Sequence, residues 1–115
     1  MKVKPAQAVT LSVSQTADIV SLLAIGCRSG DVVLGLSSVR RVAHLACIFV
    51  SRTLSAGTVR QLLLLAHQGT VIYELEDIEL IRVRVGRPDI MVLGIKSGSL
   101  AAGVTKKLEK ESNNC

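Results

Sequence analysis

The chain has 115 residues, of which 49% are hydrophobic and 20% are charged, and its net charge is +5. A chain of this size can hold a hydrophobic core without disulfides or metals, and its apolar content excludes a disordered tail. No apolar run reaches the roughly 18–20 residues of a transmembrane helix, and the basic charge favours a polyanionic partner.

Apolar periodicity predicts alternating helices and strands from residue 14 onward. Residues 1–14 are polar and broken by Pro5, and residues 112–115 are polar as well, so we expect both ends to be frayed. The first helix begins near Ser14 or Thr16, either of which can cap its first turn. In chain order, the predicted helices cover residues 14–30, 36–46, 55–69, 76–86 and 98–111, and the predicted strands cover residues 31–34, 47–50, 71–73 and 90–95.

The predicted strands are unbroken apolar runs, such as residues 47–50 and 90–95, and do not alternate between polar and apolar residues. Strands of this kind are buried on both faces, in the middle layer of a structure with helices on either side. We therefore expect a single domain over residues 1–115. Its fold class is α/β, a three-layer α/β/α sandwich around a small mixed four-stranded sheet.

Basic charge is concentrated in two segments of the chain. Residues 28–60 contain five arginines against the single acid Asp31, and residues 82–87 contain three arginines and no acid. Arginine forks bind phosphate groups and base edges through paired hydrogen bonds, which lysine cannot form. The alternative is that these arginines lie on solvated helix faces. The acids between Glu74 and Glu79 are expected to favour a helix N-terminus, with a cation site as the alternative.

The order of motifs along residues 16–108 resembles a known protein family. The segments that carry the resemblance are residues 22–30, 32–35, 47–50, 58–62, 71–73, 85–88 and 91–95. They are similar to the seven-Ae/thirty-e family of large-subunit ribosomal proteins, and most similar to its small stand-alone bacterial YlxQ-type members. The resemblance implies an α/β/α sandwich that binds structured RNA, often at kink-turns.

The family binds RNA in part through the start of its second helix. The matching stretch here contains Gly35, Ser37, Ser38 and Arg41, with Ser37 and Ser38 in place of the family's base-reading Asn and Glu. The residues of this stretch are themselves suited to binding phosphate, because a glycine allows close backbone approach and a helix start exposes free N–H groups. Arg41 lies one turn beyond the serines, on the same side of the helix. The alternative is that Ser37 only caps the helix.

The second RNA-binding part of the family is the loop before the last strand. Here that loop follows Gly86, and the resemblance assigns Arg87 and Pro88 to it. Arg28 and Arg40 are expected to contact phosphates. The acidic residue that the family carries after its second strand is Arg52 in this chain.

Catalytic and metal chemistry are not indicated. The three cysteines, Cys27, Cys47 and Cys115, lack the spacing of a zinc site or a disulfide framework, so we expect free thiols and a cytoplasmic location. His44 and His67 have no nucleophile or carboxylate at a helical offset that suggests a relay. We expect no catalytic residue, no metal, no cofactor and no membrane partner.

These observations predict a non-enzymatic protein that binds structured RNA, kink-turn-like or ribosomal, and that is ribosomal or ribosome-associated. Ribosomal or other ribonucleoprotein partners are expected with it. Two alternatives stay open. One is a protein–protein interaction module that kept the fold and lost RNA binding, and the other is a detached RNA-recognition domain of an RNA methyltransferase.

Overall fold

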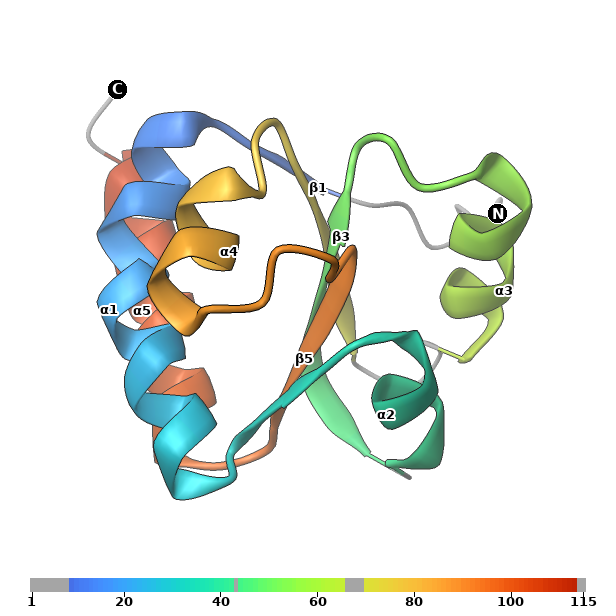
Figure 1. Cartoon of the computed structure of the whole chain (residues 1–115). Coiled ribbons are helices and arrows are strands. Elements are labelled where there is room, and N and C mark those ends of the chain that lie inside the picture. Colours follow the sequence, from blue (N-terminus) through green and yellow to red (C-terminus); the bar gives the residue numbers. More distant parts are fainter. Residues whose placement is uncertain (1–8, 43, 66–69, 114–115) are drawn as a thin grey trace, which may run out of the picture.

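The computed structural model of the chain describes residues 9–42, 44–65 and 70–113. Its centre is a five-stranded sheet in the order β1-β4-β3-β5-β2 (Figure 1). β1, β4 and β3 run parallel, while β5 is antiparallel to both β3 and β2, so the sheet is mixed. The strands are β1 (Val9–Leu11), β2 (Val32–Leu34), β3 (Leu45–Ser51), β4 (Val71–Leu75) and β5 (Val92–Lys96).

Helices cover both faces of the sheet (Figure 1). One face carries α1 (Val13–Ser29), α4 (Glu79–Val85) and α5 (Ser99–Asn113), and the other carries α2 (Leu36–Arg41) and α3 (Ala56–Leu65). Along β3, Cys47 and Phe49 point into the cluster under α1, α4 and α5, while Ile48 and Val50 point into the cluster under α2 and α3. Burial on both faces explains why the strand is an unbroken apolar run, as the sequence predicts.

The prediction of four strands was wrong, because residues 9–11 form a fifth. β1 pairs in parallel with β4, placing Val9 opposite Tyr73 and Leu11 opposite Leu75. β1 has only three residues, too few for the alternation of Val9, Thr10 and Leu11 to indicate a strand, and only Leu11 is buried. Pairing with a neighbouring strand, rather than a local pattern, determines this structure.

The start of the first helix also differs from the prediction. α1 begins at Val13, and its cap is Ser12 rather than Ser14 or Thr16. The Gln15 N–H donates to Ser12 Oγ at 3.1 Å, and the Ser12 N–H donates to Gln15 Oε1 at 2.9 Å. This reciprocal arrangement is a capping box, which satisfies two N–H groups that a helix start otherwise leaves unpaired.

Three further boundaries are shifted. The second helix ends at Arg41 instead of continuing to residue 46, because Leu45 pairs with Lys96 and extends β3. The fourth helix starts at Glu79, whose N–H donates to Asp77 Oδ1 at 2.9 Å, so the acids do favour a helix start, but later in the chain than predicted. The last helix continues to Asn113, past the predicted fraying at residue 112. The predicted end of the third helix at Gly69 lies outside the described residues.

Candidate nucleic-acid interface

The two predicted halves of the RNA site lie side by side at one end of the sheet. β2 and β5 are antiparallel neighbours, so the end of β2 meets the start of β5. The Gly35 N–H donates to the Val92 carbonyl at 2.8 Å, immediately after the last paired residues of the two strands. Leu36 and Met91 both pack against the cluster under α2 and α3. The structure therefore brings the start of α2 next to the loop that follows α4.

Gly35 is required at this end of the sheet by its backbone conformation. Its φ of 92° lies in the region that side chains with a Cβ rarely adopt. No atom lies within 4 Å of the position that a Cβ would occupy, so the surface beside Gly35 is open. Its carbonyl accepts the Val39 N–H at 3.0 Å and begins α2. An open backbone turn of this kind lets a ligand approach closely.

The polar side chains of α2 are not used to cap the helix. Ser37 is exposed and Ser38 is half-buried, and the N-cap Gly35 has no side-chain hydrogen bond, so Ser37 is not a capping residue. α2 has only six residues, and its dipole is therefore smaller than the predicted longer helix would give. The hydroxyl groups and the nearby arginines, rather than the dipole, characterise this surface.

Both arginines of α2 lie in its last turn and are exposed. Arg40 Nη2 donates to Gln61 Oε1 on α3 at 2.7 Å, a contact that orients the guanidinium without neutralising it. Within the described residues, no acidic side chain is paired with Arg41. Both guanidinium groups are therefore available to a phosphate.

The loop after α4 is held in place by Arg82. Arg82 Nε donates to the Ile90 carbonyl at 2.8 Å and Nη1 pairs with Glu79 at 2.7 Å. Arg82 belongs to the basic segment of the sequence, but in the structure its guanidinium supports the loop. Arg87 remains half-exposed, with Nε 3.6 Å from Asp89 Oδ1, and Pro88 beside it is exposed.

Arg28 is the predicted phosphate contact that the structure separates from the others. It lies in the last turn of α1, and the nearby Asp31 carbonyl accepts the Lys96 N–H at 2.8 Å. Lys96 ends β5, whereas Val92 beside Gly35 begins it. Four residue steps along a strand are about 13 Å, so Arg28 lies near the opposite end of β5 from Gly35.

Arg52 belongs to the same end of the sheet as Gly35, although its position in the sequence did not place it in the predicted site. It follows β3, and the Ser51 N–H before it donates to the Met91 carbonyl at 2.8 Å. The Arg52 side chain is exposed, and its backbone follows directly on Ser51, which is bonded to the segment after the Arg87 loop. The order of the strands, which places β3 beside β5, is the information that locates it.

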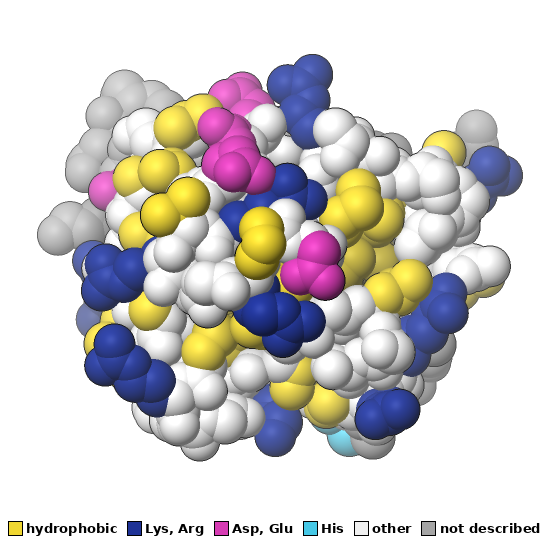
Figure 2. All heavy atoms as spheres, viewed as in Figure 1, with side chains coloured by type: hydrophobic (Ala, Val, Ile, Leu, Met, Phe, Trp, Pro, Cys, Tyr) yellow, Lys and Arg dark blue, Asp and Glu magenta, His cyan; other side chains and the backbone are white. Residues whose placement is uncertain are grey.

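The helices α2 and α3 themselves contain no acidic residue. Between Val32 and Tyr73 the sequence contains no Asp or Glu, and its charged residues are Arg40, Arg41, Arg52 and Arg60, apart from two histidines. Figure 2 shows Lys and Arg side chains along the side of α2 and α3; most acidic side chains of this view lie over α1 and α4, and one lies near the centre of the view. The fold thus converts a stretch of sequence without acids into one positively charged surface.

The aromatic and thiol groups of the chain are used in the core. Phe49 and Tyr73, the only aromatic residues, are buried and stacked with their ring centroids 5.1 Å apart. They are not available to stack on bases. Burial raises the pKa of the Cys47 thiol, which makes it a poor nucleophile. No helix in the described part of the chain is long and apolar enough to cross a membrane.

Comparison with known proteins supports the fold alone. No family model and no curated protein matches the chain. A solved structure of a protein with unknown function from Bacillus halodurans C has a TM-score of 0.69 and 16% sequence identity. The match covers 81% of this chain and 98% of that one. At this identity the similarity extends to the mixed α/β architecture and leaves the function to be argued from the surface.

Proposed function

We propose that this protein is a non-enzymatic binder of structured RNA, ribosomal or ribosome-associated, and that it acts in the cytoplasm. The RNA backbone lies along the face of α2 and α3 and the adjoining end of the sheet. Arg40, Arg41, Arg52 and Arg87 contact phosphates, and the open turn at Gly35 receives the RNA closely. The observation that carries the proposal is the lack of Asp and Glu between Val32 and Tyr73, a segment that forms α2 and α3 and carries several exposed arginines.

The resemblance to the seven-Ae/thirty-e family supports the same surface. Gly35, Ser37, Ser38 and Arg41 match one RNA-binding part of that family, and Arg87 and Pro88 match the other. A serine hydroxyl offers one rotating donor, whereas the family's Asn and Glu offer a directed donor and acceptor. We therefore propose phosphate-dominated binding with weak preference for kink-turns.

A salt titration tests this proposal. Four arginine–phosphate contacts at about 0.7–0.9 each predict that log K falls against log salt with a slope of about −3. Raising the salt from about 50 mM to about 200 mM then weakens binding roughly 50- to 150-fold. Fluorescence anisotropy with a labelled kink-turn RNA, repeated at several salt concentrations, measures both the affinity and the slope.

Matched variants locate the surface in the same assay. Arg41→Ala and Arg52→Ala each lower affinity for all RNAs and make the slope shallower by about one contact. Lys106→Ala on α5, at the far face of the sheet, is the control and leaves the slope unchanged. The sequence groups Arg28 with the phosphate contacts, whereas the structure places it at the other end of the sheet. We therefore expect Arg28→Ala to change the RNA affinity and the salt slope only slightly. A flat salt response with Arg41→Ala and Arg52→Ala silent refutes the proposal.

That negative result favours the interaction-module alternative over RNA binding. A detached recognition domain of a methyltransferase predicts a different outcome. RNA binding then follows the arginine pattern above, but the RNA recovered by crosslinking in cells carries a modified nucleotide near the crosslink. Sequencing the crosslinked RNA from cells therefore distinguishes this alternative from a stand-alone ribosomal protein.

A further inference from the structure

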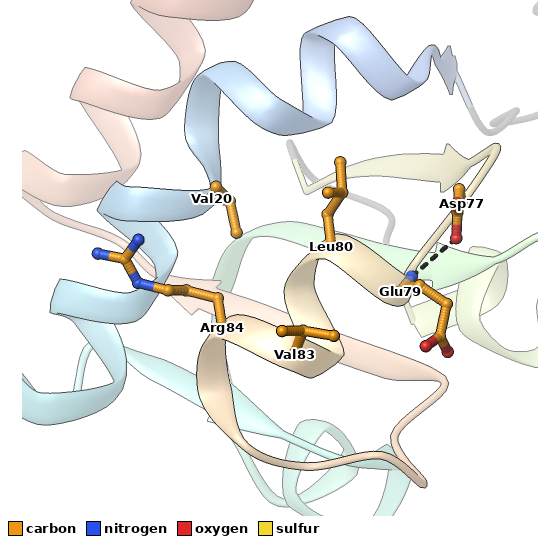
Figure 3. Close-up of a pocket in the computed structure, with 6 residues that line it drawn as sticks. All are labelled: Val20, Asp77, Glu79, Leu80, Val83 and Arg84. Atoms are coloured by element: carbon orange, nitrogen blue, oxygen red, sulfur yellow. Dashed lines mark hydrogen bonds between the residues drawn. The ribbon is translucent and has the colours of Figure 1, made fainter.

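The seam between α1 and α4 exposes a group of aliphatic side chains. Val83 is 78% exposed and Leu80 is 37% exposed, and Val20 of α1 lies beside them. They line a shallow pocket of about 350 Å³, shown in Figure 3. In Figure 2, hydrophobic side chains gather over α1 and α4, with acidic side chains directly beside them. Aliphatic side chains that are exposed as a group, rather than singly, are typical of a surface for association.

The face of α4 that points outward has a symmetrical order of side chains. Glu79, Leu80, Val83 and Arg84 lie on one side of the helix at spacings of one and four residues, while Ile81 is fully buried on the other side. We call these four residues the α4 surface. The α4 surface has a negative charge at one end, a positive charge at the other end, and two aliphatic residues between them.

This order is complementary to itself when two α4 helices pack antiparallel. A two-fold axis midway along the α4 surface places Glu79 opposite Arg84 of the partner subunit, and Leu80 opposite Val83 of the partner subunit. A two-fold contact uses the same patch on both copies, so each pairing occurs twice. The antiparallel arrangement therefore pairs the opposite charges and covers the aliphatic residues at the same time.

The charged groups of the α4 surface can take part in such a contact. Within the described residues, no acidic side chain is paired with Arg84. Glu79 uses Oε1 to pair with Arg82 at 2.7 Å and has a second carboxylate oxygen. Asp77, which accepts the Glu79 N–H at 2.9 Å, adds a further negative charge at the same end of the pocket.

We propose that two copies of this chain associate through the α4 surface about a two-fold axis. α1 extends the contact, since Val13, Ala17 and Val20 follow at helical spacing on the side that adjoins α4. α4 has only seven residues, and interfaces that bury less than about 1,200 Å² are weak and transient. The dimer is therefore concentration-dependent. The proposal does not depend on RNA binding.

Analytical ultracentrifugation of the full chain without RNA tests the proposal. Between about 10 µM and about 1 mM, the range of weak complexes, the average mass rises from 12.2 kDa towards twice that value. Val83→Asp keeps the protein monomeric throughout. Leu64→Asp is the matched control, because Leu64 is 77% exposed on α3 at the other face of the sheet. This control dimerises like the wild type.

Charge reversal tests the two-fold arrangement itself. Arg84→Glu puts a carboxylate opposite Glu79 of the partner subunit at both ends of the contact, so it raises the dissociation constant at least about tenfold. Glu79→Arg does the same, but a mixture of the two variants forms a heterodimer whose pairings are again opposite in sign. Because Glu79→Arg also loses the pair with Arg82, the melting temperature of each variant is measured first.

Each outcome decides for or against the α4 surface. A wild type that stays at 12.2 kDa at every concentration overturns the proposal. A dimer that persists in Val83→Asp, or that Leu64→Asp abolishes equally, places the contact elsewhere. If Glu79→Arg does not fold, the comparison of Val83→Asp with Leu64→Asp still tests the surface.

Discussion

Gly26 and Gly103 are both glycines inside helices, and we expect alanine to have opposite effects at the two positions. In an exposed helix interior, Gly→Ala stabilises by about 1 kcal/mol because it reduces the entropy of the unfolded chain. Gly103 in α5 has no atom within 4 Å of its Cβ position. Gly103→Ala is therefore expected to stabilise the protein by about 0.5–1 kcal/mol.

At Gly26 the same methyl group has no space. A Cβ there would lie under 3.0 Å from side-chain atoms of both Leu100 and Val32. The Leu100 methyl is the far end of a flexible side chain, but Val32 is β-branched and lies in β2, so α1 itself has to move. Overpacking of this kind costs about 1–3 kcal/mol, which exceeds the helix-propensity gain of about 1 kcal/mol. The expected net loss is up to about 2 kcal/mol.

Urea unfolding followed by circular dichroism measures both changes. For a domain near this size, about 1 kcal/mol corresponds to roughly 4 °C in Tm, so thermal unfolding provides an independent check. Gly26→Ala should lower Tm by up to about 8 °C, and Gly103→Ala should raise it by about 2–4 °C. The contact of α1 with β2 at Gly26 is incorrect if Gly26→Ala stabilises the protein as much as Gly103→Ala does.

Two further predictions concern the site and the core. Replacing Ser37 by Asn together with Ser38 by Glu should raise the preference for an intact kink-turn over one lacking its G·A pairs by about 1–3 kcal/mol, because the new side chains supply a directed base contact. Anisotropy titrations of both RNAs at one salt concentration measure this preference. An unchanged preference contradicts the assignment of Ser37 and Ser38 to the RNA site. Burial raises the pKa of Cys47 above its ordinary 9.0 and that of Tyr73 above its ordinary 10.0. The folded state therefore holds these protons to higher pH than the unfolded chain, so stability is full below about pH 9 and declines above it. Urea midpoints at about pH 8 and about pH 10.5 should show this decline, with a smaller decline in Cys47→Ala, and equal declines in the two proteins would exclude Cys47 as a cause.

The buried strands were predictable because each is a local property of the sequence. β3, β4 and β5 each contain an apolar run, over residues 45–50, 71–73 and 92–95, and burial inside a sheet covered on both faces is what such runs indicate. β1 was not predictable in this way, because two of its three residues are exposed and its structure depends on pairing with β4. The predicted length of α2 was wrong for a related reason. Ala46 continues the apolar helical spacing of Leu36 and Val39, but the pairing of the adjacent Leu45 with Lys96 places this segment in β3.

The family resemblance predicted that Gly35 and the loop of Arg87 belong to one site, whereas Arg28 was added to that site because of its charge. Gly35 and the loop of Arg87 are far apart in sequence, but antiparallel β2 and β5 bring them together. Arg28 is near Gly35 in sequence and was grouped with it by charge. It lies at the opposite end of the sheet, because β2 runs between the two residues. Arg52 reaches the site through the order of the strands, which no local pattern reveals.

The sheet also separates the charges of the molecule, and this separation bears on both proposed surfaces. The net charge of +5 combines α2 and α3, which contain no acids, with helices on the other face that carry acids such as Asp18 and Glu79. If the proposed function holds, RNA is drawn to α2 and α3 more strongly than the net charge indicates, because a polyanion responds to the local field. α4 lies on the other side of the sheet (Figure 1). In the proposed dimer both arginine faces would therefore stay uncovered, and the dimer would be able to hold two RNA segments at once.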